Sequence, residues 1–237
     1  MAWSRRARKD ERPDAAAARL DLDEEGSPAG AALDALAALV FSGSVGRGRL
    51  LPLLAIFDRE VGTIEEDDAD FDQLHLARMD WALCEANIPG GSPGDTWAWR
   101  AIHGEIEGKQ LPPSWDAAAR SLCGIFEVFP GEPAWVRDRL SGLMLRLSDS
   151  IGPWPKLPPD ESAALWELRL VPDGAGGFRM ARAPIDYPLE LLRVLEHELP
   201  RRFASPRWPA VQELRKARLR YFRAGGRTPI ARLLRFR

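Results

Sequence analysis

Cysteine, histidine and long apolar runs are scarce in this chain, and their scarcity excludes several classes of protein. The 237 residues include only two cysteines, Cys84 and Cys123, which are far apart and outside any C-x-x-C spacing. Neither a disulfide framework nor a zinc ribbon is therefore expected.

The most apolar stretch, 31–40, contains Asp34 and is shorter than the roughly 18 apolar residues that a membrane helix needs. The basic start, SRRARK, is not followed by the apolar segment of an export signal. We expect a cytoplasmic protein without a transmembrane segment.

The composition indicates a packed core and three segments. A hydrophobic share of 45% and nine tryptophans are typical of a globular protein with a full core. Residues 1–27 are charged, rich in alanine and poor in large apolar groups, which predicts a disordered N-terminal segment. We expect a helical domain over 28–152. Residues 153–237, which begin with a proline-rich connector, are expected to form a β-hairpin and basic helices packed on the same body.

Most of the chain reads as helices. Good helix formers predict helices over 28–41 and 50–61, joined by the loop GSVGRG, and an apolar helix follows the acidic stretch and extends to about residue 86. A proline with a tryptophan close behind recurs three times and predicts three further helix starts. These pairs are Pro93 with Trp97, Pro113 with Trp115, and Pro133 with Trp135. Further helices are expected at 188–203, at 208–223 and within 228–237.

One stretch, 163–185, reads as two strands and a turn. Apolar residues at 166, 168 and 170 alternate with Glu167 and Arg169, which predicts a half-buried strand with the two charged side chains facing solvent. Pro172, Asp173 and Gly174 then form a turn before a second strand. The expected fold is therefore mainly α, a helical bundle of about six to eight helices with one late β-hairpin.

The acidic residues before the third helix resemble a calcium loop only superficially. Asp68, Asp70 and Asp72 have D-x-D-x-D spacing. The sixth position is Gln73 where the loop needs glycine, and the twelfth is Met79 where it needs a bidentate glutamate. Acids at a helix start also favour the positive end of the helix dipole, which is the simpler interpretation. We predict no metal and no cofactor.

Two glycine-rich motifs also lack the context that their chemistry requires. Residues 90–94 match G-x-S-x-G, but a helix is expected before them where a nucleophile elbow needs a strand. Residues 43–49 precede a helix and offer backbone N–H groups and arginines to an anion, but they lack the ending of a P-loop. The first motif reads as a loop and the second as a connector, with an anion site as its alternative. No catalytic residue is assigned.

Histidine-based sites remain as an enzyme alternative. His103 and Glu105 resemble the first half of a zinc deaminase site, but the P-C-x-x-C half is missing. Glu196, His197 and Glu198 are neighbours, although on a helix they point about 100° apart. Either set would need a pocket where distant groups converge. The balance is against an enzyme.

The charge layout is the strongest functional signal. From residue 201 onward there are twelve basic residues and a single acid, Glu213, a net charge of +11 in a chain whose formal net charge is −2. Such asymmetry favours an acidic partner for the basic region, while pairing with the chain's own acids is the structural alternative. The predicted contact residues are Arg215, Lys216, Arg218, Arg220, Arg223 and Arg227.

The leading hypothesis is a non-catalytic intracellular binding or assembly subunit. Its basic C-terminal region would dock on an acidic partner protein or on nucleic acid. One alternative is an enzyme with a carboxylate- or metal-assisted site around His103 and Glu105 or around 196–198. The other is an oligomeric structural component, such as a homo-oligomer, which would expose an apolar stripe.

Overall fold

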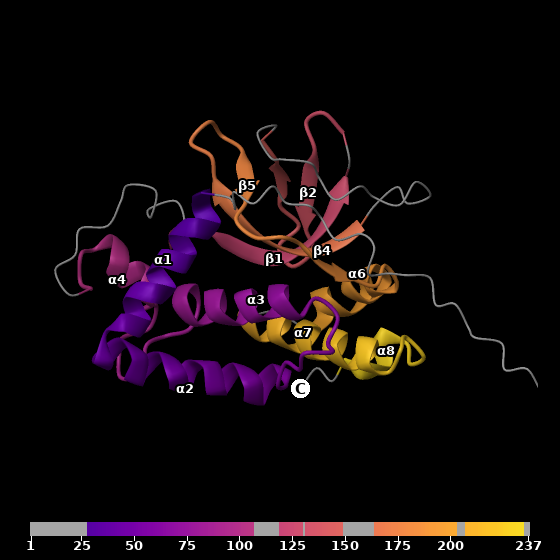
Figure 1. Ribbon diagram of the computed structural model, residues 1–237. Coiled ribbons are helices and arrows are strands. Elements are labelled where there is room, and N and C mark those ends of the chain that lie inside the picture. The colour runs from indigo at the N-terminus through magenta and orange to yellow at the C-terminus, as the bar shows by residue number, and fades with distance from the viewer. Residues whose placement is uncertain (1–27, 107–118, 130, 149–163, 203–206, 235–237) are drawn as a thin grey trace, which may run out of the picture.

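The computed structural model describes residues 28–106, 119–129, 131–148, 164–202 and 207–234. A curled β-sheet lies above a layer of helices (Figure 1). Residues 1–27, the connector 153–159 and the helix start at Trp115 lie outside the described residues, so the expectations for them are not addressed.

Within the described residues, four helices with assigned bounds precede the sheet. They are α1 (Pro28–Ser42), α2 (Ser44–Val61), α3 (Phe71–Cys84) and the short α4 (Trp97–Ile102). Thr96 caps α4, because its hydroxyl oxygen accepts a hydrogen bond from the Trp99 N–H at 3.1 Å. The predicted helix start at Trp97 is therefore confirmed.

The expected loop between the first two helices is instead the first turns of α2. Gly43 takes an extended conformation at the N-cap, and helical backbone begins at the next residue. Gly46 explains how α2 can start so close to α1, since a β-carbon there would lie 2.3 Å from the carbonyl oxygen of Val40. Glycine permits a backbone approach that any larger residue would block.

In the described part of the chain that comes after the sheet there are three helices. They are α6 (Glu190–Arg202), α7 (Arg207–Arg223) and α8 (Ile230–Leu233). The periodicity over 188–203 and 208–223 predicted the first two within a few residues. Figure 1 shows α7 below the sheet, alongside α2 and α3.

The sheet has six described strands, all paired antiparallel. They are β1 (Leu122–Phe129), β2 (Trp135–Asp138), β3 (Met144–Arg146), β4 (Ala164–Pro172), β5 (Phe178–Met180) and β6 (Ile185–Tyr187). The order is β3-β2-β1-β4-β5, and β6 also pairs with β4. The two edges meet where Leu147 bridges to Phe178 and the Ser148 N–H donates to the Phe178 carbonyl oxygen at 2.8 Å. The sheet therefore curls into a half-barrel.

The expectation of a mainly α bundle with one late hairpin, and with it the all-α description, is wrong. The hairpin itself is confirmed, since β4 pairs with β5. Residues 122–146, expected to be helical, instead form β1, β2 and β3. Pro133 lies just before β2, and Trp135 is its first residue. Exposed and buried residues alternate along β2, the period of two that marks a half-buried strand. Proline is as compatible with the start of a strand as with the start of a helix, which made this motif ambiguous.

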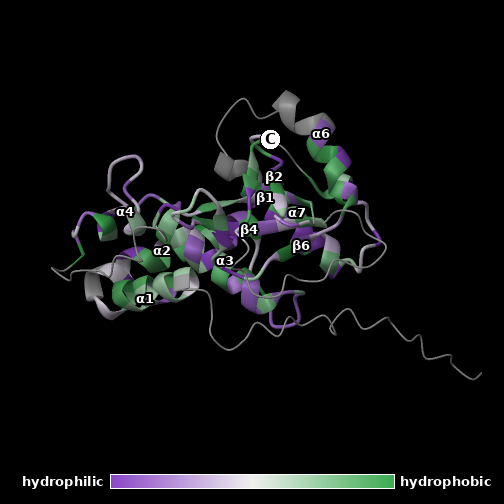
Figure 2. Ribbon diagram, turned by 90° about the horizontal axis from the view of Figure 1, so that it is seen from above, coloured by the Kyte–Doolittle hydropathy of each residue, from purple (hydrophilic) through white to green (hydrophobic). Residues whose placement is uncertain are grey.

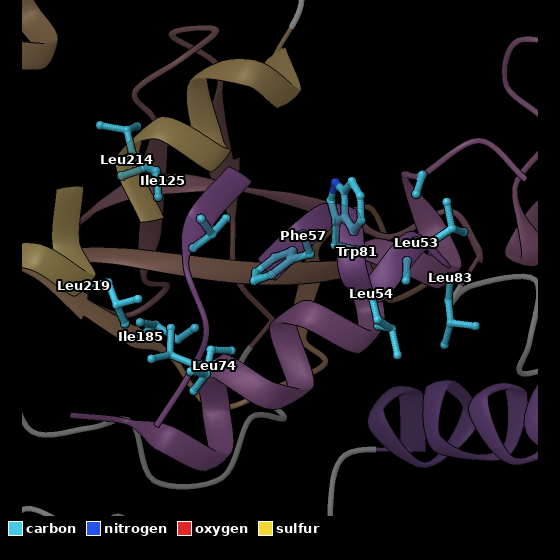
Figure 3. Packing of buried hydrophobic residues seen from close by; sticks show 14 of the residues in the cluster. Leu53, Leu54, Phe57, Leu74, Trp81, Leu83, Ile125, Ile185, Leu214 and Leu219 are labelled. Atoms are coloured by element: carbon cyan, nitrogen blue, oxygen red, sulfur yellow. The ribbon is translucent and has the colours of Figure 1, made fainter. Parts of the chain in front are cut away.

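β4 is the structural centre, because its two faces contribute to two different cores. Trp166, Leu168 and Leu170 point into the half-barrel, together with Phe126 and Val128 of β1. The other face of the sheet packs on the helices. Figure 3 shows this second core, in which Ile125 and Ile185 of the sheet meet side chains of α2, α3 and α7.

The charged residues of β4 are therefore buried, contrary to expectation. Glu167 and Arg169 point toward the helical layer and are 3% and 4% exposed. Figure 2 shows hydrophilic segments of β4 and β6 at the centre of the molecule, where the sheet lies over the helices. The sequence showed the correct alternation, but α3 and α7 cover the face that was expected to be solvated.

Among the described residues no single helix has the length and apolar composition to cross a membrane. Segments Ala29–Ser42 and Gly46–Val61 meet both criteria only when taken together, and they are bent by 116° at their junction.

Candidate functional site

The basic C-terminal region divides into buried and exposed residues. Arg215 and Arg218 are each 1% exposed, and Lys216 on the same helix is half-buried. Arg220 and Arg227 are exposed. Arg223 is exposed but ion-paired, as described below. The structure thus distributes the six predicted contact residues between the interior and the surface.

Arg215 forms a buried ion pair with Glu167 of β4. Its Nη2 and Nε atoms lie 2.5 Å and 2.9 Å from Glu167 Oε1, and its Nη1 donates to Gln212 Oε1 at 3.1 Å. The Tyr187 hydroxyl donates to the other oxygen of Glu167 at 3.0 Å. Cys123 Sγ completes the group, 3.7 Å from Glu167 Oε1 and 3.6 Å from Arg215 Nη2. A charged carboxylate so far from water needs these donors.

The protonation states follow from these contacts. Burial alone would raise the pKa of Glu167, but the charge and hydrogen bonds of Arg215 and the hydroxyl of Tyr187 outweigh it and lower the pKa. Burial, reinforced by the negative charge of Glu167, raises the pKa of Cys123 to about 12. The thiolate is the nucleophilic and metal-binding form, so Cys123 is a protonated, unreactive thiol at neutral pH.

A second group of charges continues from Arg169 of β4. Arg169 contacts Glu85 through Nη1 at 2.8 Å and Nη2 at 2.9 Å, and its Nε lies 3.2 Å from Asp80 Oδ2. Asp80 also accepts two hydrogen bonds from Arg182, each at 3.0 Å. Burial raises the pKa of Glu85 even against the charge of Arg169. We call the residues of these two groups the buried ionic cluster: Asp80, Glu85, Cys123, Glu167, Arg169, Arg182, Tyr187 and Arg215.

The acids before α3 are bound by arginines of α7. Arg218 Nη2 forms an ion pair with Asp70, and Arg218 Nε donates to the carbonyl oxygen of Asp186 at 2.5 Å. Arg223 donates to both oxygens of Asp68 at 2.7 Å and to the Thr63 carbonyl oxygen at 2.6 Å. These carboxylates therefore hold guanidinium groups, and the described residues contain no group of three or more side chains that could hold a metal ion.

A small cavity opens beside the buried ionic cluster. It is lined by Asp80, Cys123, Glu167, Arg169, Arg182 and Arg215, among others, and its volume is ≈ 20 Å³. That volume holds about one water molecule. Small-molecule pockets are commonly about 300–1,000 Å³, so this cavity is too small for a substrate. The cluster can hold a water and orient charges, but it cannot bind an organic ligand without rearrangement.

Among the residues proposed for an enzyme site, His103, Glu105 and Glu196 have described side chains, and these three do not converge. His103, at the end of α4, is exposed and stacks on Trp99 with ring centres 4.0 Å apart, and Glu105 is also exposed. Glu196 on α6 pairs with Arg139 at 3.0 Å. Figures 1 and 2 both place α4 and α6 at opposite ends of the molecule. The side chains of His197 and Glu198 lie outside the part of the chain that is described.

The reasoning from sequence alone missed the buried ionic cluster. Its members come from α3, β1, β4, β6, α7 and the segments between them, so no short motif contains them. Strict alternation of Glu167 and Arg169 with leucines in β4 was the available signal. The same pattern is expected for a strand whose charged face meets solvent and for a strand whose charged side chains form ion pairs inside the protein. The pattern alone does not distinguish the two.

Comparison of the chain with protein-family models, with curated proteins and with solved structures finds no match. These comparisons therefore assign no function to the chain, and its chemistry is inferred from its own residues.

Proposed function

We propose that the chain is a non-catalytic binding or assembly subunit that docks on an acidic surface, of a partner protein or of nucleic acid. Lys216, Arg220 and Arg227 make the contact. One observation carries this proposal: these three cations keep solvent access, and none forms an ion pair with a carboxylate in the described part of the chain. Arg215 and Arg218 instead hold α7 against β4 and the start of α3.

The placement of these cations suits contact with a polyanion. Lys216 and Arg220 are four residues apart on α7, so they lie on the same face of that helix. Arg227 follows in the turn after α7, where Gly225 and Gly226 both have positive φ. Unpaired cations on one surface attract an acidic partner from a distance, and the attraction weakens as salt rises.

Charge reversal tests the proposal. The variant carries Lys216→Glu and Arg220→Glu, and the control carries Arg59→Glu and Arg193→Glu, which makes the same charge change at exposed positions of α2 and α6. Binding is measured by fluorescence anisotropy against a duplex DNA of about 20 base pairs and against a polyglutamate peptide, each over a range of salt.

We expect the first variant to weaken binding at least tenfold and the control to leave it unchanged. If DNA is the ligand, the slope of log affinity against log salt should fall by about 0.9 for each lost phosphate contact, or about 1.8 for the pair. Loss of DNA binding alone assigns the surface to nucleic acid, and loss of polyglutamate binding assigns it to an acidic protein. Equal binding by wild type and variant to both probes contradicts the proposal.

A further inference from the structure

The outer face of the half-barrel is only partly covered by helices. On β4 and the first half of β1 this face packs on the helical layer, through residues such as Ile125 and Leu165. The same face continues across β2 and β3, where Trp135 is 39% and Met144 48% exposed. Figure 1 shows β2 standing clear of the helices on the upper side of the molecule. The sheet thus presents an uncovered surface next to a covered one.

The strand register fixes which side chains meet on this surface. Phe129, Trp135 and Arg146 stand opposite one another in one row across β1, β2 and β3. Arg137 and Met144 stand opposite one another in the next row. Neighbouring strands are about 4.8 Å apart, so these side chains lie side by side. We call these five residues the β2–β3 platform.

The two arginines of the β2–β3 platform keep their charge available. Neither Arg137 nor Arg146 forms an ion pair within the described residues. Glu127, which stands opposite Arg137 in the register, is bound to Arg139 at 3.1 Å instead. The platform therefore combines two aromatic rings on adjacent strands with two cations that have no carboxylate partner in the described part of the chain.

We propose that the β2–β3 platform binds single-stranded nucleic acid. Bases that are free of a duplex stack on exposed aromatic rings, and aromatic residues on adjacent strands of an open sheet face can stack two consecutive bases. Trp135, which is exposed, and Phe129, which is half-buried beside it, supply the rings. The exposed Arg137 and the half-buried Arg146 contact the phosphates on either side. Stacking is tolerant of sequence because every base has a π-face, so the preference is for strandedness and not for a particular sequence.

A second copy of the chain fits this surface less well. A two-fold interface would place the same patch on both sides and gather Arg137 and Arg146 of both copies into one interface. Like charges that face each other across an interface are unfavourable. Self-association through the exposed apolar residues is therefore an outcome that the experiment must separate from nucleic-acid binding.

This inference does not rest on the proposed function of the C-terminal cations. Figure 1 places β2 in the upper part of the sheet and α7 and α8 below the sheet, so the two surfaces can be disabled separately. A variant with Lys216→Glu and Arg220→Glu removes one surface, and a variant with Arg137→Glu and Arg146→Glu removes the other. Either surface can then fail without the other.

The experiment measures the affinity of the full chain for a fluorescent oligo-dT of about 15 nucleotides and for a duplex of equal length. The variants are Trp135→Ala, Trp135→Phe and the Arg137→Glu/Arg146→Glu double substitution. Trp99→Ala is the matched control, because Trp99 is 44% exposed on α4 while the neighbouring Arg100 is held by Asp95 at 2.7 Å. Circular dichroism checks that each variant is folded, and elution volume reports its mass.

We expect the single strand to bind more tightly than the duplex, and Trp135→Ala to weaken that binding about tenfold or more. Trp135→Phe should keep most of the affinity, and the arginine variant should lose affinity and reduce the salt dependence. Trp99→Ala should bind like wild type. The proposal would be overturned if wild type did not bind oligo-dT at low salt, or if Trp135→Ala bound it as tightly as wild type does. It would also be overturned if wild type were a dimer that Trp135→Ala dissociates while oligo-dT binding does not change.

Discussion

Replacement of Arg215 by methionine should destabilise the protein severely, although Arg215 belongs to a region whose charge suggests external binding. The substitution removes the main donor to Glu167 and leaves a carboxylate that is 3% exposed with only the hydroxyl of Tyr187 and the thiol of Cys123 beside it. Breaking a buried pair by removal of one partner costs about 3–5 kcal/mol, because the remaining charge is neither solvated nor compensated.

The expected change in melting temperature follows from the size of the chain. For a domain of about 150–250 residues, each kcal/mol of stability corresponds to about 2–4 °C in Tm. The loss at Arg215 should therefore lower Tm by about 6–20 °C. Arg220→Met is the matched control, because Arg220 lies on the same helix but is exposed, and such surface changes are usually within about 0.5 kcal/mol.

Thermal unfolding followed by circular dichroism at neutral pH measures both variants, together with Glu167→Met and the Glu167→Met/Arg215→Met double variant. Replacement of a whole buried ion pair by apolar residues of similar volume is often neutral, so the double variant should recover much of the stability that Arg215→Met loses. If Arg215→Met melts like Arg220→Met, or if the double variant is as unstable as the sum of its single substitutions, Glu167 and Arg215 are not coupled and the reasoning is refuted.

Three further predictions concern other parts of the fold. Folding lowers the pKa of Glu167, so the stability that its charge contributes is complete above about pH 4.3 and declines as the pH falls below that value. The difference in Tm between wild type and Glu167→Gln should therefore shrink below about pH 4.3. In a Cys84→Ser background, Cys123 should react with a thiol reagent only after denaturation, since burial raises its pKa to about 12; rapid reaction of the native protein would contradict this. Gly46→Ala should destabilise the protein by about 1–3 kcal/mol, because its β-carbon would collide with the Val40 carbonyl oxygen. Gly48→Ala is the control and should not destabilise it, because a β-carbon at Gly48 would have nothing within 4 Å. Equal unfolding midpoints of the two variants in urea would contradict the close approach of α1 and α2.

The longer helices of this protein could largely be predicted from sequence, because good helix formers or apolar stripes mark them. The stripes at 188–203 and 208–223 correspond to α6 and α7, and the hairpin at 163–185 was readable from its alternation and turn. The strands β2 and β3 were not, since they contain only four and three residues. A pattern with a period of two cannot be distinguished from other local patterns over so few positions.

The candidate site was harder to predict, because its contacts are long-range. Arg215 and Glu167 are 48 residues apart, and Arg223 and Asp68 are 155 apart. A count of charges along the chain identifies the basic C-terminal region but not which acids neutralise it. Pairing with the chain's own acids was the structural alternative, and it accounts for Arg215, Arg218 and Arg223 but not for Lys216, Arg220 or Arg227.

The three paired arginines attach α7 to the sheet and to the start of α3. Their different exposure determines which of these ion pairs salt can weaken. Arg223 is the most exposed of them, at 37%, so salt should weaken its pair with Asp68 first. The pair between Arg215 and Glu167 is shielded from ions by the surrounding core, so the attachment of α7 to β4 should persist. A loss of binding at moderate salt would then reflect screening of Lys216, Arg220 and Arg227 at the surface, and not release of the helix that carries them.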